Sequence, residues 1–249
     1  MQIKKHLPNL ITLLNLFCGC IAIVLVTKDQ FDMAFYFVCL GIFLDFFDGF
    51  FARLFQVSSP LGLQLDSLAD MVTSGVVPGL VMFCMMLKSY NNPPLEGVDQ
   101  HILFSTLGFL ITLGSCYRLA NFNIDTRQTD SFIGLPTPAN ALFIMSLPLI
   151  LKHSDSLVLL EILTNQWVLL AITFFSAYIL NAEIPLFSLK IKEFSFKKNA
   201  LQIVFLSLSL MLLAFFQFLG IPLVIMAYVL LSVVNNKFLK KQVILHGEK

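Results

Sequence analysis

Charged side chains and histidines are scarce in this chain. Of its 249 residues, 12% are charged and four are histidine, whereas soluble domains carry about 25% charged residues. Hydrophobic residues make up 57% of the chain, and the mean hydropathy is +0.85. The chain is therefore predicted to be an integral membrane protein in contact with membrane lipids. Its net charge of +1 gives no indication of a nucleic-acid partner.

The positions of the histidines and cysteines exclude several kinds of site. All four histidines lie outside the apolar stretches, so zinc chemistry or a serine-type catalytic triad inside the membrane is not expected. They are His6, His101, His153 and His246. The five cysteines lie in or at the ends of apolar stretches. Their spacing indicates neither a disulfide framework nor a metal site.

The apolar stretches predict an all-α polytopic bundle that forms a single membrane domain over residues 1–249. At roughly 20 residues per membrane-spanning helix, the chain has room for about eight helices. Their expected ranges are about 9–27, 31–54, 63–87, 103–123, 137–152, 157–181, 199–218 and 220–236. Gly220 and Pro222 predict a tight reversal between the last two.

The distribution of lysine and arginine predicts the orientation of the bundle. Three of the 16 basic residues fall in one set of connections, at Lys28, Lys88 and Lys152. The other thirteen fall in the opposite set or at its helix ends: Lys4, Lys5, Arg53, Arg118, Arg127, Lys190, Lys192, Lys197, Lys198, Lys237, Lys240, Lys241 and Lys249. Basic residues are enriched on the cytoplasmic side of membranes. We therefore expect both termini and the turn at Pro60 to be cytoplasmic.

Four aspartates are concentrated between residues 45 and 70. They follow the pattern Asp-x2-Asp-Gly-x2-Ala-Arg-x8-Gly-x3-Asp-x3-Asp, which begins at Asp45. Residues three or four apart share one face of a helix. The first two aspartates are therefore expected on one helix and the last two on the next, with a turn at Pro60 and Gly62 between them.

This group of carboxylates needs a cationic partner. An aspartate at mid-bilayer costs about 2.5–3.5 kcal/mol, and neighbouring carboxylates repel one another. One arginine, Arg53, does not balance four acids. Oxygen ligands without histidine or cysteine favour Mg²⁺ or Mn²⁺. The alternative is a set of acids that reach the cytoplasmic interface without binding a metal, but two pairs at matching helical spacing favour the metal site.

The complete pattern resembles the signature of the CDP-alcohol phosphotransferases. Every fixed position is present: Asp45, Asp48, Gly49, Ala52, Arg53, Gly62, Asp66 and Asp70. The resemblance covers about residues 5–200, and it implies a six-helix core followed by two additional helices at about 199–236. It also implies transfer of the phosphatidyl group of CDP-diacylglycerol to an alcohol, with release of CMP and with two divalent ions as cofactors.

The resemblance assigns roles to individual residues. The metal ions would be held by Asp45, Asp48, Asp66 and Asp70, and Asp70 would also be the catalytic base for the alcohol. Contacts with CDP-diacylglycerol are implied for Asn9, Thr12, Gly49, Ala52, Arg53, Ser59 and Gly62. Asn9, Thr12 and Asn15 share one helix face, so their alternative role is capping or cross-linking of helices.

Three further segments resemble the bacterial phosphatidylserine synthase branch of this family. They are PNLITLLNLFCG from Pro8, RLANFN from Arg118 and GLPTPA from Gly134, and they indicate L-serine as the acceptor. Arg118 is then either a clamp for a phosphate or a serine carboxylate, or an interfacial anchor. Asn121 stands where that branch often has an arginine, so one anion contact differs.

Other functions stay open at this point. The acceptor could instead be glycerol 3-phosphate or inositol. Intramembrane prenyltransferases also use aspartate-rich helix pairs with Mg²⁺ and a diphosphate, but they give no reason for Gly49, Ala52 and Arg53. A proton or cation transporter would carry its acids along a path across the bilayer. Gly75-x3-Gly79 predicts close helix packing, either within the chain or in a homodimer.

Overall fold

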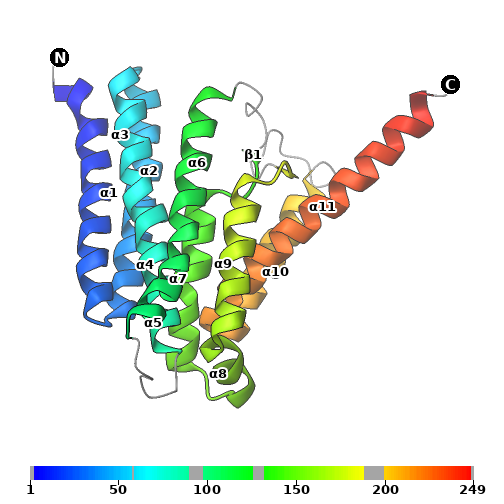
Figure 1. Ribbon diagram of the computed structural model, residues 1–249. Helices are drawn as coiled ribbons and strands as arrows, with labels where there is room; N and C mark the ends of the chain where they lie inside the picture. The colour runs from blue at the N-terminus through cyan, green and yellow to red at the C-terminus, as the bar shows by residue number, and fades with distance from the viewer. Residues whose placement is uncertain (1–2, 58, 90–97, 126–131, 188–198, 248–249) are drawn as a thin grey trace.

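The computed structural model describes residues 3–57, 59–89, 98–125, 132–187 and 199–247. The elements up to the middle of the chain are α1 (Ile3–Thr27), α2 (Phe31–Phe55), α3 (Pro60–Asp70), the π-helix η1 (Met71–Val76), α4 (Val77–Lys88), α5 (Val98–Ser105), the 3-10 helix η2 (Thr106–Phe109) and α6 (Leu110–Ile124). They are followed by β1 (Phe132–Ile133), α7 (Thr137–His153), α8 (Leu157–Thr164), α9 (Gln166–Asn181), β2 (Pro185–Leu186), α10 (Ala200–Phe216), the 3-10 helix η3 (Gln217–Leu219) and α11 (Gly220–Gly247). The predicted helical bundle is confirmed (Figure 1).

Several of these helices have the length and composition of membrane spans. Five stretches of the described chain are long and apolar enough to cross a bilayer, or up to six if the bent pair α8 and α9 is one span. The polytopic membrane class is thus supported, while the expected number of eight is not confirmed. Two features explain the difference. Helix α7 has only 17 residues, and α10 and α11 form one apolar stretch, Ala200–Asn236.

The sixth predicted helix, at about 157–181, is wrong in one respect. The chain bends by 71° between α8 and α9. At this point the side chain of Asn165 accepts hydrogen bonds from the backbone N–H groups of Trp167 (2.9 Å) and Val168 (3.4 Å). Such a side-chain cap begins a new helix, so α8 and α9 are separate helices with different directions.

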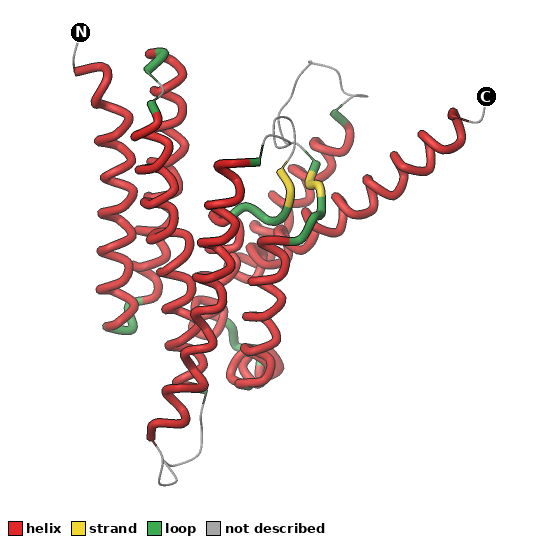
Figure 2. Tube along the Cα trace, turned by 45° about the horizontal axis from the view of Figure 1, so that its top comes forward, coloured by secondary structure: helices red, strands yellow, loops and turns green. Residues whose placement is uncertain are grey.

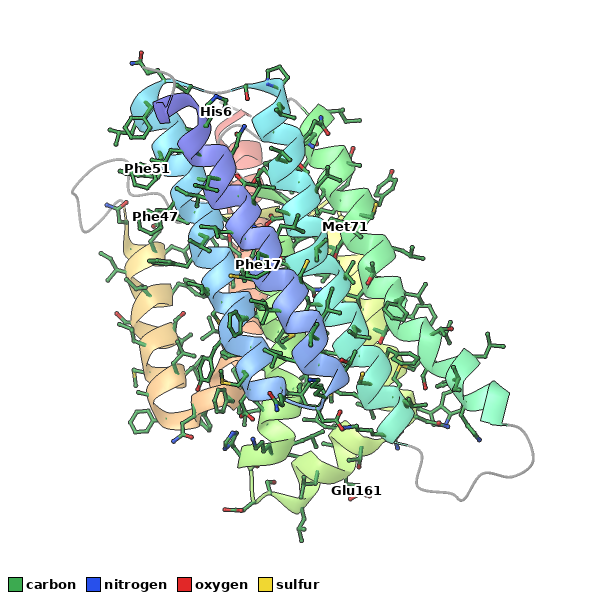
Figure 3. All side chains as sticks on the ribbon, turned by 90° about the vertical axis from the view of Figure 1, so that its left-hand side faces the viewer. His6, Phe17, Phe47, Phe51, Met71 and Glu161 are labelled. Atoms are coloured by element: carbon green, nitrogen blue, oxygen red, sulfur yellow. The ribbon has the colours of Figure 1, made fainter. Side chains whose placement is uncertain are left out.

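The hydrophobic core lies where α1, α2, α4 and α7 pack together. Fully buried side chains from these four helices include Ala22, Val38, Met82 and Ile144. Large apolar side chains also point outward from the bundle, as Phe17 does on α1 (Figure 3). A bundle that is apolar on both its inner and outer surfaces is expected in a membrane, where lipid surrounds the outer face.

The third span combines α3, η1 and α4, with the π-helix in the middle. Thr112 of α6 donates a hydrogen bond to the carbonyl of Gly75 at 2.9 Å. A Cβ atom at Gly79 would lie 2.1 Å from Thr112 Oγ1. Both glycines therefore face α6, and the Gly75-x3-Gly79 pattern is a contact within the chain. Homodimer formation stays a prediction.

The C-terminal helices lie on the side of the bundle away from α1 (Figure 2). Helices α10 and α11 form a hairpin that turns at Gln217, whose φ is 48°. The hairpin contacts the rest of the bundle mainly through α7 and β2. The short strands β1 and β2 pair antiparallel, and they are the only described exception to the all-α class.

Candidate active site

Helices α2 and α3 bring three of the four predicted metal ligands together. One carboxylate oxygen from each of Asp45, Asp48 and Asp66 lies within 4.8 Å of the other two. The α2 residues are one turn apart, and the turn before α3 places Asp66 opposite them. The helical spacing of the aspartates in the sequence thus produces the expected cluster. Asp70 is one turn further along α3 and lies outside this group of three.

Helix α1 supplies a hydrogen-bond donor to each of the two carboxylate helices. Thr12 Oγ1 lies 2.5 Å from Asp48 Oδ2 and donates to it. One turn later, Asn15 Nδ2 donates to Asp70 Oδ1 at 3.2 Å. Figure 3 shows α1 crossing in front of α2 and α3, with Met71 of η1 on the span beside it. Helix α1 therefore fixes the positions of acids on two different helices.

A cavity of about 180 Å³ adjoins the carboxylate cluster. Asp48 and Asp66 form part of its wall, and the other lining residues are Pro8, Asn9, Thr12, Gly49, Ala52, Val57, Ser59, Gly62 and Leu63. Except for Arg53, every residue implied to contact CDP-diacylglycerol lines this cavity. The sequence pattern therefore identified a single concave site formed by α1, α2 and the start of α3.

The beginning of α3 forms one wall of the cavity. Ser59 is the N-cap of this helix, and its hydroxyl accepts a hydrogen bond from the N–H of Gly62 at 3.0 Å. Gly62 also leaves room beside α1, because a Cβ there would lie 3.2 Å from Asn9 Oδ1. A helix N-terminus carries partial positive charge and favours anionic groups. The cavity thus has acids on one side and an anion-binding helix end on the other.

Arg53 lies at the edge of this site. It is exposed in the last turn of α2. Its Nη2 atom lies 4.0 Å from where a Cβ at Gly49 would be. The missing side chain at Gly49 therefore leaves open space between the cavity wall and a guanidinium group, where an anion would fit.

Arg118 is buried, whereas the alternative role of an interfacial anchor would leave it exposed. It is 8% exposed, and its guanidinium lies 5.8 Å from the ring centre of Phe122. It interacts electrostatically with Asp70, which is 9% exposed. An anchoring arginine would extend into the headgroup region. The burial of Arg118 and its electrostatic interaction with Asp70 are unlike that arrangement.

Two buried hydroxyl groups in the part of the site with Asp70 and Arg118 were not predicted from the sequence. Ser74 lies in η1, and Ser115 lies one turn before Arg118 on α6. Their Oγ atoms are buried and have no hydrogen-bond partner among the described residues, as is also true of Arg118 Nε. Ser115 packs against η1, since a Cβ added at Gly75 would lie 3.2 Å from the Cβ of Ser115. Ser115 could have been recognised from its position three residues before Arg118, which puts the two side chains on one face of a helix.

The carboxylate cluster fits a divalent cation. Its ligands are all oxygen, which suits Mg²⁺ or Mn²⁺. Asp45 Oδ1 is buried without a hydrogen-bond partner among the described residues, and an unpaired anionic oxygen in a membrane-embedded bundle requires a counter-charge. The three aspartates can therefore hold one metal ion, and Asp70 lies beyond them.

Comparisons with known proteins give a family match over most of the chain. Residues 5–179 match the sequence profile of the family described as CDP-alcohol phosphatidyltransferase. A Bacillus subtilis protein is 36% identical over 134 residues, a Helicobacter pylori J99 protein is 38% identical over 140, and a Saccharomyces cerevisiae protein is 32% identical over 163. Each of these relatives is named CDP-diacylglycerol–serine O-phosphatidyltransferase.

The similarity is partial in length. The matched parts are 54%, 55% and 59% of this chain, in the same order. They cover 70% of the Bacillus relative but only 55% of the Helicobacter and yeast relatives. The family profile ends at residue 179, within α9. Helices α10 and α11 therefore lie outside the part that matches the profile.

Proposed function

Because this chain belongs to the CDP-alcohol phosphatidyltransferase family, we propose that it transfers the phosphatidyl group of CDP-diacylglycerol to L-serine. The products are phosphatidylserine and CMP. The names of its relatives support serine over glycerol 3-phosphate or inositol as the acceptor. Family membership removes the reason to consider a prenyltransferase. The clustering of three acids at one place, rather than along a path, is unlike a transporter.

One observation carries the proposal: a cavity that joins a carboxylate cluster to a helix N-terminus. A nucleoside diphosphate lipid carries two negative phosphates and needs both a cation and backbone donors. In this arrangement the diphosphate lies between the aspartates and the first turn of α3, with Arg53 at its outer edge. Gly49, Ala52 and Gly62 leave the cavity wall without bulky side chains, so the nucleotide approaches the backbone. Asn9 and Thr12 form the α1 wall.

The metal requirement follows from charge. We assign Asp45, Asp48 and Asp66 to the first divalent ion, and Asp70 with them to a second. Bound divalent cations neutralise the diphosphate and stabilise the leaving phosphate. Four aspartates, Arg53 and Arg118 carry a net charge of −2. Two divalent ions and a diphosphate of charge −2 then bring the whole site to zero.

We assign Asp70 to the acceptor rather than to the nucleotide. It is buried beyond the three-carboxylate group and does not line the cavity. In the proposed reaction the serine hydroxyl oxygen attacks the phosphorus that carries the diacylglycerol. The new oxygen–phosphorus bond forms as the bond to the CMP oxygen breaks, and the hydroxyl proton passes to Asp70. A carboxylate is a weak base for an alcohol, so this proton moves late in the reaction.

Arg118 and its neighbours are assigned to the amino acid. The guanidinium interacts electrostatically with Asp70, so a serine whose carboxylate binds Arg118 would present its hydroxyl toward the base. Arginine suits a carboxylate because its fork of N–H groups makes two parallel hydrogen bonds. The unpartnered hydroxyl of Ser115 offers a further polar contact on the same helix.

We also propose that the site faces the cytoplasm and that both termini are cytoplasmic. Two of the three basic residues of the opposite side form ion pairs there. Lys88 pairs with Asp29 at 2.5 Å, and Lys152 pairs with Asp32. Both pairs lie at the far ends of the helices from Pro60 and the cavity. The thirteen-to-three distribution of lysine and arginine supports a cavity on the cytoplasmic side.

The test is CMP release by the purified protein with labelled CDP-diacylglycerol and a panel of alcohols. Serine should support turnover in Mg²⁺ or Mn²⁺, while glycerol 3-phosphate and inositol should not. Arg118→Gln should raise the KM for serine at least about tenfold, as expected for loss of a charge-assisted contact. Tyr178→Phe, at an exposed position on α9, is the matched control. Release of CMP with another alcohol but not with serine would disprove the assignment.

A further inference from the structure

Asn15 is a buried amide that the proposed binding contacts leave unexplained. It lies in the middle of α1 with 0% of its surface exposed, and it does not line the nucleotide cavity. Its Nδ2 atom donates to Asp70 Oδ1 at 3.2 Å, across 55 residues of sequence. This is the only hydrogen bond that the described residues provide to the side chain of Asn15.

The surroundings of Asn15 hold the amide in one orientation. A Cβ at Gly41 would lie 2.8 Å from Asn15 Oδ1, so α2 approaches the amide closely and leaves no room for rotation. Thr73 of η1 donates a hydrogen bond to the backbone carbonyl of Asn15 at 3.2 Å. A Cβ at Gly19 would lie 2.6 Å from that Thr73 hydroxyl. Two glycines therefore make space for a hydrogen-bonded contact between α1 and the third span.

The direction of the amide follows from its partner. A carboxylate oxygen accepts hydrogen bonds, so the NH₂ group and not the carbonyl must face Asp70. The amide oxygen then points to Gly41 and has no partner among the described residues. A buried acceptor without a donor lowers stability. Packing alone would be served better by an apolar side chain of similar size, so the contact with Asp70 is the favourable interaction that the described residues offer this amide.

We propose that Asn15 is a positioning residue for Asp70. Its hydrogen bond holds Oδ1 and fixes the plane of the group, so the other oxygen would keep one direction for its contacts with the metal and with the acceptor hydroxyl. The inference rests on the proposed function, because it assigns Asp70 to that step. Residues that orient a catalytic group typically change its effectiveness by about 10–100-fold, since small displacements of reacting atoms are costly.

The test compares turnover, nucleotide binding and stability in the same variants. Asn15→Leu removes the donor and keeps the volume. We expect kcat for CMP release to fall about 10–100-fold, while the dissociation constant for CDP in Mn²⁺ changes by no more than about threefold. Gly41→Ala reaches the same contact from α2, because the added Cβ would displace the amide. It should lower kcat in the same direction, and it keeps the test available if Asn15→Leu does not fold.

Asn140→Leu is the matched control. Asn140 is 1% exposed and its amide oxygen accepts a hydrogen bond from Ser176, so the substitution removes a buried interhelical bond of the same kind elsewhere. It should lower the unfolding temperature and leave kcat within about twofold. The inference is overturned if Asn15→Leu lowers kcat no more than Asn140→Leu does, or if CDP affinity falls as much as kcat.

The same measurements separate this inference from the proposed function. If the unaltered protein releases CMP with an alcohol other than serine, the acceptor assignment fails, and the Asn15 comparison is made with that alcohol. If it releases no CMP with any alcohol, both proposals fail. If it is active and Asn15→Leu is equally active, only the positioning role fails.

Discussion

The carboxylate cluster should make Asp45→Asn stabilising without metal and destabilising with it. Asp45, Asp48 and Asp66 have oxygens within 4.8 Å of one another. At that distance two unit charges repel by about 3.5 kcal/mol for an effective dielectric constant of about 20. Loss of the Asp45 charge removes two such terms. Uptake of a proton by the cluster already relieves most of this repulsion in the unaltered protein, so the expected net gain is about 1 kcal/mol, or about 2–4 °C.

Bound metal should reverse the order of stability of Asp45→Asn and the unaltered protein. At a concentration one hundred times the dissociation constant, a bound ion stabilises the folded state by about 2.7 kcal/mol, which corresponds to about 5–10 °C. Asp45→Asn removes a metal ligand and should lose most of this gain. The unaltered protein should therefore unfold at a lower temperature than Asp45→Asn in EDTA, and at a higher temperature than Asp45→Asn in Mn²⁺.

In a background where the exposed Cys20 and Cys116 are replaced by serine, a thiol-reactive dye can follow this unfolding in detergent. Cys18 is free and only 5% exposed, so it becomes reactive when α1 separates from the bundle. Asp32→Asn is the control, because Asp32 pairs with Lys152 and His153 at the other end of the molecule. It should lower the unfolding temperature by the same amount with and without Mn²⁺. If Asp45→Asn were less stable in EDTA, or if Mn²⁺ stabilised it fully, the three aspartates would not be a metal site.

Four further results are expected. Asp70→Asn should lower kcat by about 10²–10⁴-fold, the range for a lost general base. Much CDP-diacylglycerol binding should survive in Asp70→Asn, whereas Asp45→Asn should lose both turnover and binding. Near-normal turnover of Asp70→Asn would reject Asp70 as the base. EDTA treatment should stop CMP release, and added Mn²⁺ should restore it. Full turnover after EDTA treatment would contradict the metal requirement. Gly108→Ala should destabilise the protein by about 1–3 kcal/mol in the same dye assay, because its Cβ would lie 2.6 Å from the backbone N of Phe83; an unchanged unfolding temperature would contradict this packing. A cysteine at position 60 should be labelled from the cytoplasm and one at position 92, outside the described residues, from the other side; the reverse would overturn the proposed orientation.

The parts of the site that could be predicted from the sequence are those that depend on helical spacing. Asp45 with Asp48, and the position of Asp66 opposite them, follow from the i, i+3 and i, i+4 periodicity and one turn at Pro60. The contacts that join different helices could not be predicted, because they depend on how α1 and α6 pack. For this reason the sequence left Thr12 open between a nucleotide contact and a cross-link between helices, and Thr12 both lines the cavity and donates to Asp48. A cross-link was also an alternative for Asn15, but its partner Asp70 was not predicted.

The differences in the fold have a similar origin. The bend between α8 and α9 depends on a cap by Asn165, which a hydropathy pattern does not distinguish from a polar residue in a continuous helix. The π-helix at Met71–Val76 consists mostly of residues with low helix propensity, and Pro78 of α4 follows it closely. A proline has no N–H to donate to the carbonyl four residues before it, which here is that of Ser74. These features weaken a regular helix at this point, but a single-sequence pattern does not distinguish a π-turn from a kink.

The π-helix η1 lets the third span present two contact faces that its number of residues would not align in a regular helix. It separates Asp66 and Asp70, which face α1 and α2, from Gly79, which faces α6. Each residue of an α-helix advances it by about 100° around the axis, and a π-turn contains one more residue than an α-turn. The extra residue is taken up in the wide turn, so deletion of one residue here would leave a regular helix with both halves in their present directions. Conversion of η1 into an α-helix at the same chain length would instead rotate one half by about 100°, and either the acids would turn away from α1 or the glycine away from α6.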